Sequence, residues 1–91
     1  MMRWVDEATA EQIGAVEAAL ATLPGEIPEI RSYTVGTDAR VNEGNFDFVV
    51  VADFDDVNDY LVYRDHPVHV AVLTERIRPI LAERAAIQHE I

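Results

Sequence analysis

Hydrophobic residues recur with helical spacing in the first third of the chain. A short apolar run at residues 1–5 predicts a strand, and residues 9–23 then carry apolar side chains three and four positions apart. These side chains are Ile13, Val16, Leu20 and Leu23. Thr9 followed by Gln12 matches a capping box, which satisfies free backbone N–H groups where a helix begins. Because Pro24 and Gly25 end the pattern, we expect a helix over residues 9–23.

Two stretches in the middle of the chain have the alternation of strands. Residues 30–37 are rich in β-branched and aromatic side chains, and residues 46–54 alternate more regularly. One face of the second stretch carries Phe46, Phe48, Val50, Ala52 and Phe54, and the other carries Asp47, Val49, Val51 and Asp53. Since both faces are apolar at the centre, we expect helices to cover one face and a second subunit to cover the other.

The rest of the chain predicts a broken helical region and a last strand. Asp55 or Asp56 caps a short helix, and Pro67 suits the first position of the next one. In that helix Val70, Leu73, Ile77 and Leu81 share one face. Pro79 kinks or ends it. The tail at residues 85–91 alternates Ile87, His89 and Ile91, which predicts a final strand with His89 in an interior or an interface.

The predicted order is β-α-β-β-α-β over a single domain of 91 residues. This order is typical of an α+β, ferredoxin-like fold, in which helices cover one face of a four-stranded antiparallel sheet. A chain of this length builds one modest core and gains stability from association with a second copy.

The charge balance excludes several classes of function. Seventeen acidic residues face seven arginines, and the net charge is −10. Such a surface repels phosphate backbones and anionic lipids, so we expect neither a nucleic-acid partner nor a membrane partner. No signal peptide, long apolar run or cysteine is visible, so a cytoplasmic location is the default expectation. The absence of lysine and cysteine excludes Schiff-base and thiolate chemistry, and Ser32 lacks the glycines of a nucleophile elbow. Histidine, tyrosine and carboxylates remain for chemistry, and no cofactor is expected.

Two of the three histidines lie in the segment YLVYRDHPVHV. His66 precedes Pro67, which favours an extended conformation and a capping role at the helix start. His69 follows one turn later and is a candidate general acid or base, or else a histidine bonded to a nearby carboxylate or carbonyl. The pair could also hold a metal ion with Asp65 or Asp59. Helix-based zinc motifs space their histidines by four residues and supply a third ligand, so we predict no metal site.

Four stretches resemble the stress-responsive A/B barrel (Dabb) domain family. They are RSYTVGTD (31–38), NEGNFDFVVVADFDD (42–56), YRDHPVHV (63–70) and RAAIQHEI (84–91). Their order carries the resemblance, since HPxH alone is a weak motif. The resemblance implies a homodimer in which two sheets close into an α/β barrel. Family members commonly place a histidine near the start of the first strand, and this sequence lacks it. Either the first strand is truncated or the start site lies upstream.

The resemblance leaves two functions open. Some family members are similar to plant polyketide cyclases, in which a tyrosine and a histidine perform an aldol condensation. Tyr63 and His69 match those residues, so His69 would take a proton next to a carbonyl while the Tyr63 hydroxyl stabilises the oxyanion. The other function is a non-catalytic homodimer that holds a small apolar or phenolic ligand between sheet and helices. His66, Phe48 and Val50 are then the expected ligand contacts. An enzyme requires an apolar pocket beside His69.

Overall fold

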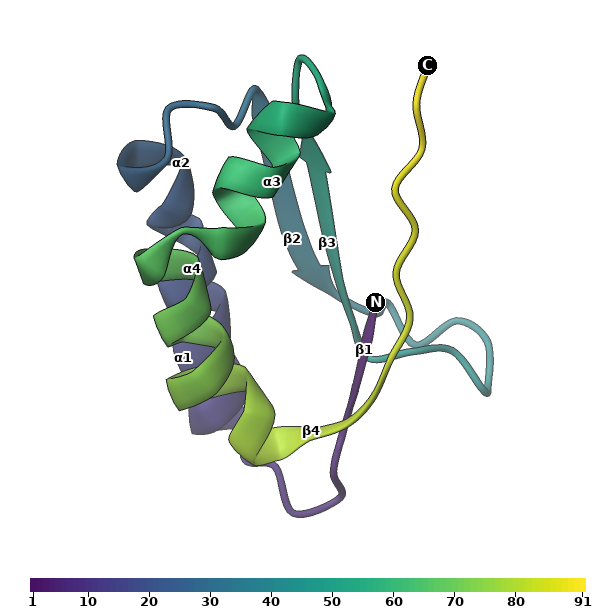
Figure 1. Ribbon diagram of the computed structural model, residues 1–91. Coiled ribbons are helices and arrows are strands. Elements are labelled where there is room, and N and C mark those ends of the chain that lie inside the picture. Colours follow the sequence, from purple (N-terminus) through teal and green to yellow (C-terminus); the bar gives the residue numbers. More distant parts are fainter.

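A four-stranded antiparallel sheet forms one layer of the computed structural model, which describes residues 1–91, and helices cover one of its faces (Figure 1). The strands are β1 (Met2–Trp4), β2 (Ser32–Thr37), β3 (Phe48–Asp53) and β4 (Leu81–Arg84), in the order β2-β3-β1-β4. The helices are α1 (Ala10–Ala21), α2 (Leu23–Glu26), α3 (Val57–Asp65) and α4 (Pro67–Val72). A π-helical turn η1 (Leu73–Ile77) and a 3₁₀ turn η2 (Arg78–Ile80) extend α4. The predicted ferredoxin-like α+β fold is confirmed.

The first helix begins as the sequence predicts. The backbone N–H of Gln12 donates to the Thr9 hydroxyl at 3.1 Å, and the Thr9 N–H donates to the Gln12 side-chain oxygen at 2.9 Å. This capping box satisfies two N–H groups that have no partner within the helix. Of the predicted stripe, Val16, Leu20 and Leu23 are buried and Ile13 packs partly buried against the core. The predicted end is wrong, because α1 ends at Ala21 and Pro24 and Gly25 lie inside the short helix α2.

The β2–β3 hairpin has the predicted division of faces. The two strands pair without a break from Ser32↔Asp53 to Thr37↔Phe48. Phe48 points to the helices and is 2% exposed, whereas Val49 and Val51 on the opposite face are 38% and 53% exposed. The outer face of the sheet is therefore apolar at its centre and open within the chain.

The predicted position of the last strand is wrong. Its actual span is Leu81–Arg84, and residues 86–91 belong to no strand. Ala85 and Met1 exchange two backbone hydrogen bonds, of 2.8 and 2.9 Å, where the β1–β4 ladder ends. The alternation of apolar residues in the tail thus does not reflect pairing within this chain. Ile87 is 86% exposed, and His89 is exposed rather than interior.

The predicted face of the second long helix also needs correction. Val70 is 44% exposed, and Leu81 belongs to β4 rather than to the helix. Ile77 is buried as predicted, and the other buried side chains of this region are His69, Val72 and Ile80. The π-helical turn winds more widely than an α-helix, so it changes which side chains face the core. Pro79 lies in the closing 3₁₀ turn, where its missing N–H favours the end of the helix.

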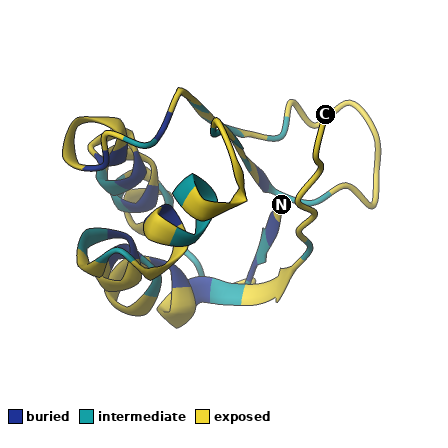
Figure 2. Cartoon of the chain, turned by 45° about the horizontal axis from the view of Figure 1, so that its top comes forward, coloured by how far each residue is buried: buried dark blue, intermediate teal, exposed yellow.

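The core fills the space between the sheet and the helices, where Figure 2 shows the buried segments facing one another. It contains Met2, Trp4, Val16, Leu20, Leu23, Ile27, Ile30, Phe48, Tyr63, Val72, Ile77 and Ile80. Every helix and strand of the chain except α3, β2 and β4 contributes a fully apolar side chain to it, and α3 contributes Tyr63. None of the helices combines the length and the apolar character that a membrane crossing requires.

Candidate functional site

The junction of α3 and α4 is fixed by hydrogen bonds to the backbone. Asp56 caps α3 by accepting from the N–H of Asp59 at 2.8 Å. His66 follows the end of α3 in an extended conformation, with φ −62° and ψ 133°. Its Nδ1 accepts from the N–H of Val68 at 3.1 Å, and Pro67 occupies the first helical position. The predicted capping role of His66 is confirmed, and the bond to Val68 places the proton of a neutral His66 on Nε2.

His69 lies one turn into α4, against Tyr63 at the end of α3. Their ring centroids are 4.2 Å apart and the planes are inclined by 36°. Both residues are buried, each with 8% of its surface exposed. The helix break at Pro67 thus folds two sequence-predicted candidates onto each other, ring against ring.

The tautomer of His69 follows from its partner. Nδ1 lies 3.0 Å from the backbone oxygen of Arg64. A carbonyl oxygen can only accept, so Nδ1 carries the proton and Nε2 keeps its lone pair. Nε2 has no hydrogen-bond partner in the chain, yet it is not among the fully buried unpaired atoms, which are Arg3 Nε and Trp4 Nε1. Nε2 is therefore not fully buried.

The electrostatic surroundings keep His69 neutral near pH 7. Burial lowers the pKa of its imidazole, and the hydrogen bond to the Arg64 carbonyl opposes this only in part. His66 lowers the pKa further and Asp65 raises it. A neutral imidazole with a free Nε2 lone pair can act as a base or accept a hydrogen bond.

An aromatic cluster surrounds Tyr63. The rings of Phe54, Tyr33 and Tyr60 lie with their centroids 5.2, 6.0 and 6.3 Å from that of Tyr63. The hydroxyl of Tyr33, on β2, lies 2.9 Å from the hydroxyl of Tyr63. Burial raises the pKa of both phenols, so both are protonated at neutral pH.

The hydroxyl contact of Tyr33 was not predicted from the sequence. The available signal was the alternation of β2, because Tyr33 pairs with Ala52 on the inner face of β3. That register places Tyr33 on the side of the sheet where α3 packs. Tyr63 could not be identified as its partner from local spacing, since the two residues lie 30 positions apart.

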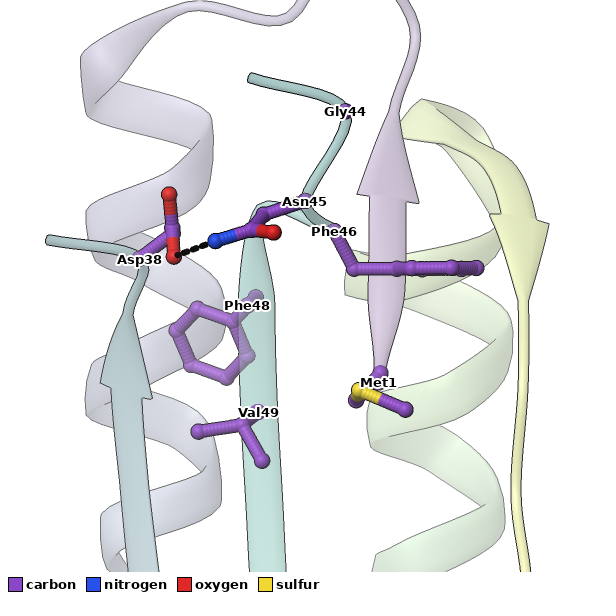
Figure 3. A pocket seen from close by; sticks show the side chains of 7 residues that line it. All are labelled: Met1, Asp38, Gly44, Asn45, Phe46, Phe48 and Val49. Carbon is purple, nitrogen blue, oxygen red and sulfur yellow. Dashed lines mark hydrogen bonds between the residues drawn. The ribbon is translucent and has the colours of Figure 1, made fainter. Parts of the chain in front are cut away.

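Two surface hollows of about 410 and 420 Å³ lie elsewhere on the chain. Figure 3 shows the first, which is lined by Met1, Asp38, Gly44, Asn45, Phe46, Phe48 and Val49. The second lies between the start of α1 and the end of the last helical turn. Tyr63 and His69 line neither hollow. Of the three predicted ligand contacts, Phe48 lines the first hollow, while Val50 and His66 do not.

No group of three or more histidine, aspartate and glutamate side chains is arranged to hold a metal ion. The Nδ1 atoms of His66 and His69 are engaged with Val68 and Arg64 respectively. The two histidines thus serve different backbone partners instead of converging on one point.

Comparisons with known proteins agree with this fold. The family model described as the stress responsive A/B barrel domain matches residues 1–91. A dimeric ferredoxin-like protein of unknown function from Thermobifida fusca is 43% identical with a TM-score of 0.92, and the match covers 100% of this chain and 85% of that one. A dimeric protein of unknown function with a ferredoxin-like fold, from Bacteroides fragilis, is 25% identical with a TM-score of 0.84, covering 99% of this chain and 89% of that one.

A more distant structure shares the fold alone. The hydroxynitrile lyase from Passiflora edulis is 21% identical with a TM-score of 0.77, and the match covers 90% of this chain and 79% of that one. Among curated proteins, no sequence matches the chain. Because the family model spans the whole sequence, this chain belongs to the stress-responsive A/B barrel domain family.

Proposed function

We propose that the chain works as a homodimer and that each subunit binds a small, largely apolar molecule through one hydroxyl or carbonyl oxygen. The ligand site is inferred from the free Nε2 of a buried, neutral His69, which lies beside the hydroxyl-bearing ring of Tyr63. The observation that carries the dimer is the open apolar centre of the outer sheet face.

The outer sheet face has the character of a subunit interface. Val49 and Val51 lie exposed on it, opposite the helices. The C-terminal segment, residues 86–91, runs on the same side of the sheet in both views (Figures 1 and 2). It adds two exposed isoleucines, Ile87 and Ile91. A second copy packed against this face would remove all four side chains from water. The proteins from Thermobifida fusca and Bacteroides fragilis are themselves described as dimeric.

The donor and acceptor pattern at Tyr63 and His69 favours a phenol or an enol as ligand. Such an oxygen donates its proton to Nε2 of His69 and accepts a hydrogen bond from a tyrosine hydroxyl. The surrounding rings of Phe54 and Tyr60 supply an apolar setting for the carbon skeleton. His66, Phe48 and Val50 stay predicted contacts for the apolar part of the molecule.

Binding of resorcinol and its alkyl derivatives tests the ligand site. Titration calorimetry and thermal shift on the full chain should detect saturable binding. His69→Ala and Tyr63→Phe should each weaken it about tenfold, as expected for one lost hydrogen bond in a dry site. Tyr60→Phe is the matched control, because the Tyr60 hydroxyl makes no hydrogen bond to Tyr63 or His69. Equal weakening in all three variants, or no binding by the parent, argues against this site.

A second candidate is an enzyme that removes a proton next to a carbonyl group. Nε2 of His69 would take the proton, the C–H electron pair would form the enolate C=C bond, and Tyr63 would donate to the negative oxygen. The neutral state of His69 favours this candidate. The direct contact of the two rings leaves no gap between them for a reacting carbon, which favours binding without turnover.

Deuterium exchange distinguishes the two candidates. A methyl ketone that carries a phenol ring is incubated with the protein in heavy water and followed by proton NMR. An enzyme accelerates exchange at the carbon next to the carbonyl, and His69→Gln abolishes the acceleration. A binding protein leaves the exchange rate at the buffer value while the resonances of the ketone still shift.

A further inference from the structure

The hydroxyls of Tyr33 and Tyr63 lie 2.9 Å apart, and they come from opposite layers of the fold. Tyr33 projects from the inner face of β2, and Tyr63 from the last turn of α3. Their rings meet edge to face, with centroids 6.0 Å apart and an angle of 62°. Two aromatic neighbours could pack without bringing their oxygens together, so the contact of the hydroxyls is a separate feature of the site.

We propose that Tyr33 is a positioning residue, whose hydroxyl donates to the Tyr63 oxygen and thereby directs the Tyr63 proton to the ligand beside His69. The ligand part rests on the proposed function. Each phenol has a single proton to donate. If Tyr63 donated to Tyr33, its only proton would be used within the protein, and the ligand oxygen would receive no hydrogen bond from it.

The surroundings of the pair support this direction. Burial raises the pKa of both phenols. The shared hydrogen bond raises the pKa of Tyr33 further and works against burial at Tyr63. Tyr63 is therefore the phenol that more readily shares its proton with an outside oxygen. A hydroxyl that accepts a hydrogen bond also becomes a stronger donor, because each bond in a chain polarises the next.

Few other charged groups face this pair. The titratable neighbours of the Tyr63 ring, apart from Tyr33, are Tyr60 on α3 and His69 on α4. Asp65 and Arg64 lie beside His69 and form an ion pair with each other at 2.9 Å. The pKa of Tyr63 is thus governed by burial, by the hydrogen bond with Tyr33 and by the neighbouring Tyr60.

Titration of the ligand-free protein tests whether the Tyr33 hydroxyl donates to the Tyr63 oxygen when Tyr63 ionises. The full chain with Tyr60→Phe contains only Tyr33 and Tyr63 as tyrosines. Isotope-labelled tyrosine ring carbons are followed by NMR as the pH is raised, with circular dichroism as a check that the fold persists. Adding Tyr33→Phe leaves Tyr63 alone, and its titration midpoint should rise by about one pH unit or more, because its ionised form loses a donor. Adding Tyr63→Phe instead should lower the midpoint of Tyr33.

A midpoint of Tyr63 that stays constant or falls in the Tyr33→Phe variant would overturn the proposal. Binding of para-nitrophenol, at a pH that keeps its hydroxyl protonated, supplies a second readout, because this hydroxyl can donate to Nε2 of His69 and accept from Tyr63. Tyr33→Phe should weaken it at least fivefold, and unchanged binding would show that Tyr33 does not act on the ligand. Failure of the parent protein to bind the phenol would contradict the proposed function, while the titration would still decide the bond between the two tyrosines.

Discussion

The imidazole of His69 lies against the ring of Tyr63, with 4.2 Å between the centroids. This contact joins the last turn of α3 to the first turn of α4 across the break at Pro67. The Arg64 carbonyl, one residue past Tyr63, accepts from Nδ1 and fixes the imidazole. The backbone of α3 therefore supplies both the ring that His69 contacts and the acceptor that sets its tautomer.

The burial of His69 predicts how stability changes with pH. Its folded pKa lies below the usual histidine value of about 6.5. As the pH falls below about 6.5, the unfolded chain binds a proton that the folded chain resists, so stability is fully present above this pH and is lost below it. His69→Gln should flatten the rise in the free energy of unfolding between about pH 5 and 7, measured by urea denaturation. If the free energy of unfolding of His69→Gln rises as steeply with pH as that of the parent, other groups cause the pH dependence.

A charged substitution on the outer face of the sheet should separate the two subunits. Val51→Asp places a charge at the centre of the proposed interface, where burial of an unpaired carboxylate is highly unfavourable. We expect the dimer dissociation constant to rise at least about 100-fold, measured by sedimentation equilibrium. Val70→Asp is the control, since Val70 is similarly exposed but lies on the helical layer. If Val51→Asp remains a dimer, the subunits meet through another surface.

The C-terminal segment should strengthen association without stabilising the isolated fold. Ile87 and Ile91 are exposed within the chain, and the C-terminal segment to which they belong runs on the side of the open sheet face (Figure 1). Replacing both with serine should raise the dissociation constant of the dimer by about 10-fold or more, because two apolar side chains are then no longer buried on association. The denaturation midpoint of the monomer, measured at high dilution, should stay unchanged. Gln88→Ala in the same segment controls for local effects, and a lower monomer midpoint would mean that the tail packs on its own subunit.

Asp47 links β3 to β1 where the regular ladder is short. Its carboxylate accepts from the backbone N–H of Trp4 at 2.8 Å and pairs with Arg40 at 2.9 Å. The bond from Trp4, followed by the interactions with Arg40, holds the pKa of Asp47 below its usual value. Asp47→Ala should reduce the free energy of unfolding by about 1–2 kcal/mol, the size expected for a partly exposed charged hydrogen bond.

The pH dependence of this effect has a definite sign. Because the folded pKa is depressed, the contribution of Asp47 is present above the unfolded value of about 3.9 and is lost as the pH falls through the folded pKa. The difference in urea denaturation between parent and Asp47→Ala should shrink below about pH 4. Asp47→Asn keeps an acceptor for Trp4 and should lose less stability than Asp47→Ala. Equal losses would assign the effect to the charge alone.

Local patterns in the sequence predicted most of the fold. The capping box at Thr9 and Gln12, the stripe of α1 and the two faces of β3 depend on residues a few positions apart, and all three predictions are confirmed. The same holds for the cap at His66, because a residue before proline is restricted by its own neighbours. Tyr63 and His69 were paired through the resemblance to polyketide cyclases, and the structure places their rings in contact.

The errors in prediction arise where distant segments meet. Alternation at residues 85–91 resembles a strand, but a strand also requires a partner, and the β1–β4 ladder ends at Ala85. The hydroxyl contact of Tyr33 with Tyr63 and the bond from Trp4 to Asp47 join residues 30 and 43 positions apart. The sequence by itself determined the start and buried stripe of α1 and the two faces of β3, because periodicity is a local property of the chain. Only the tertiary structure decided which side chains meet, because those contacts depend on how the sheet and the helices pack across the core.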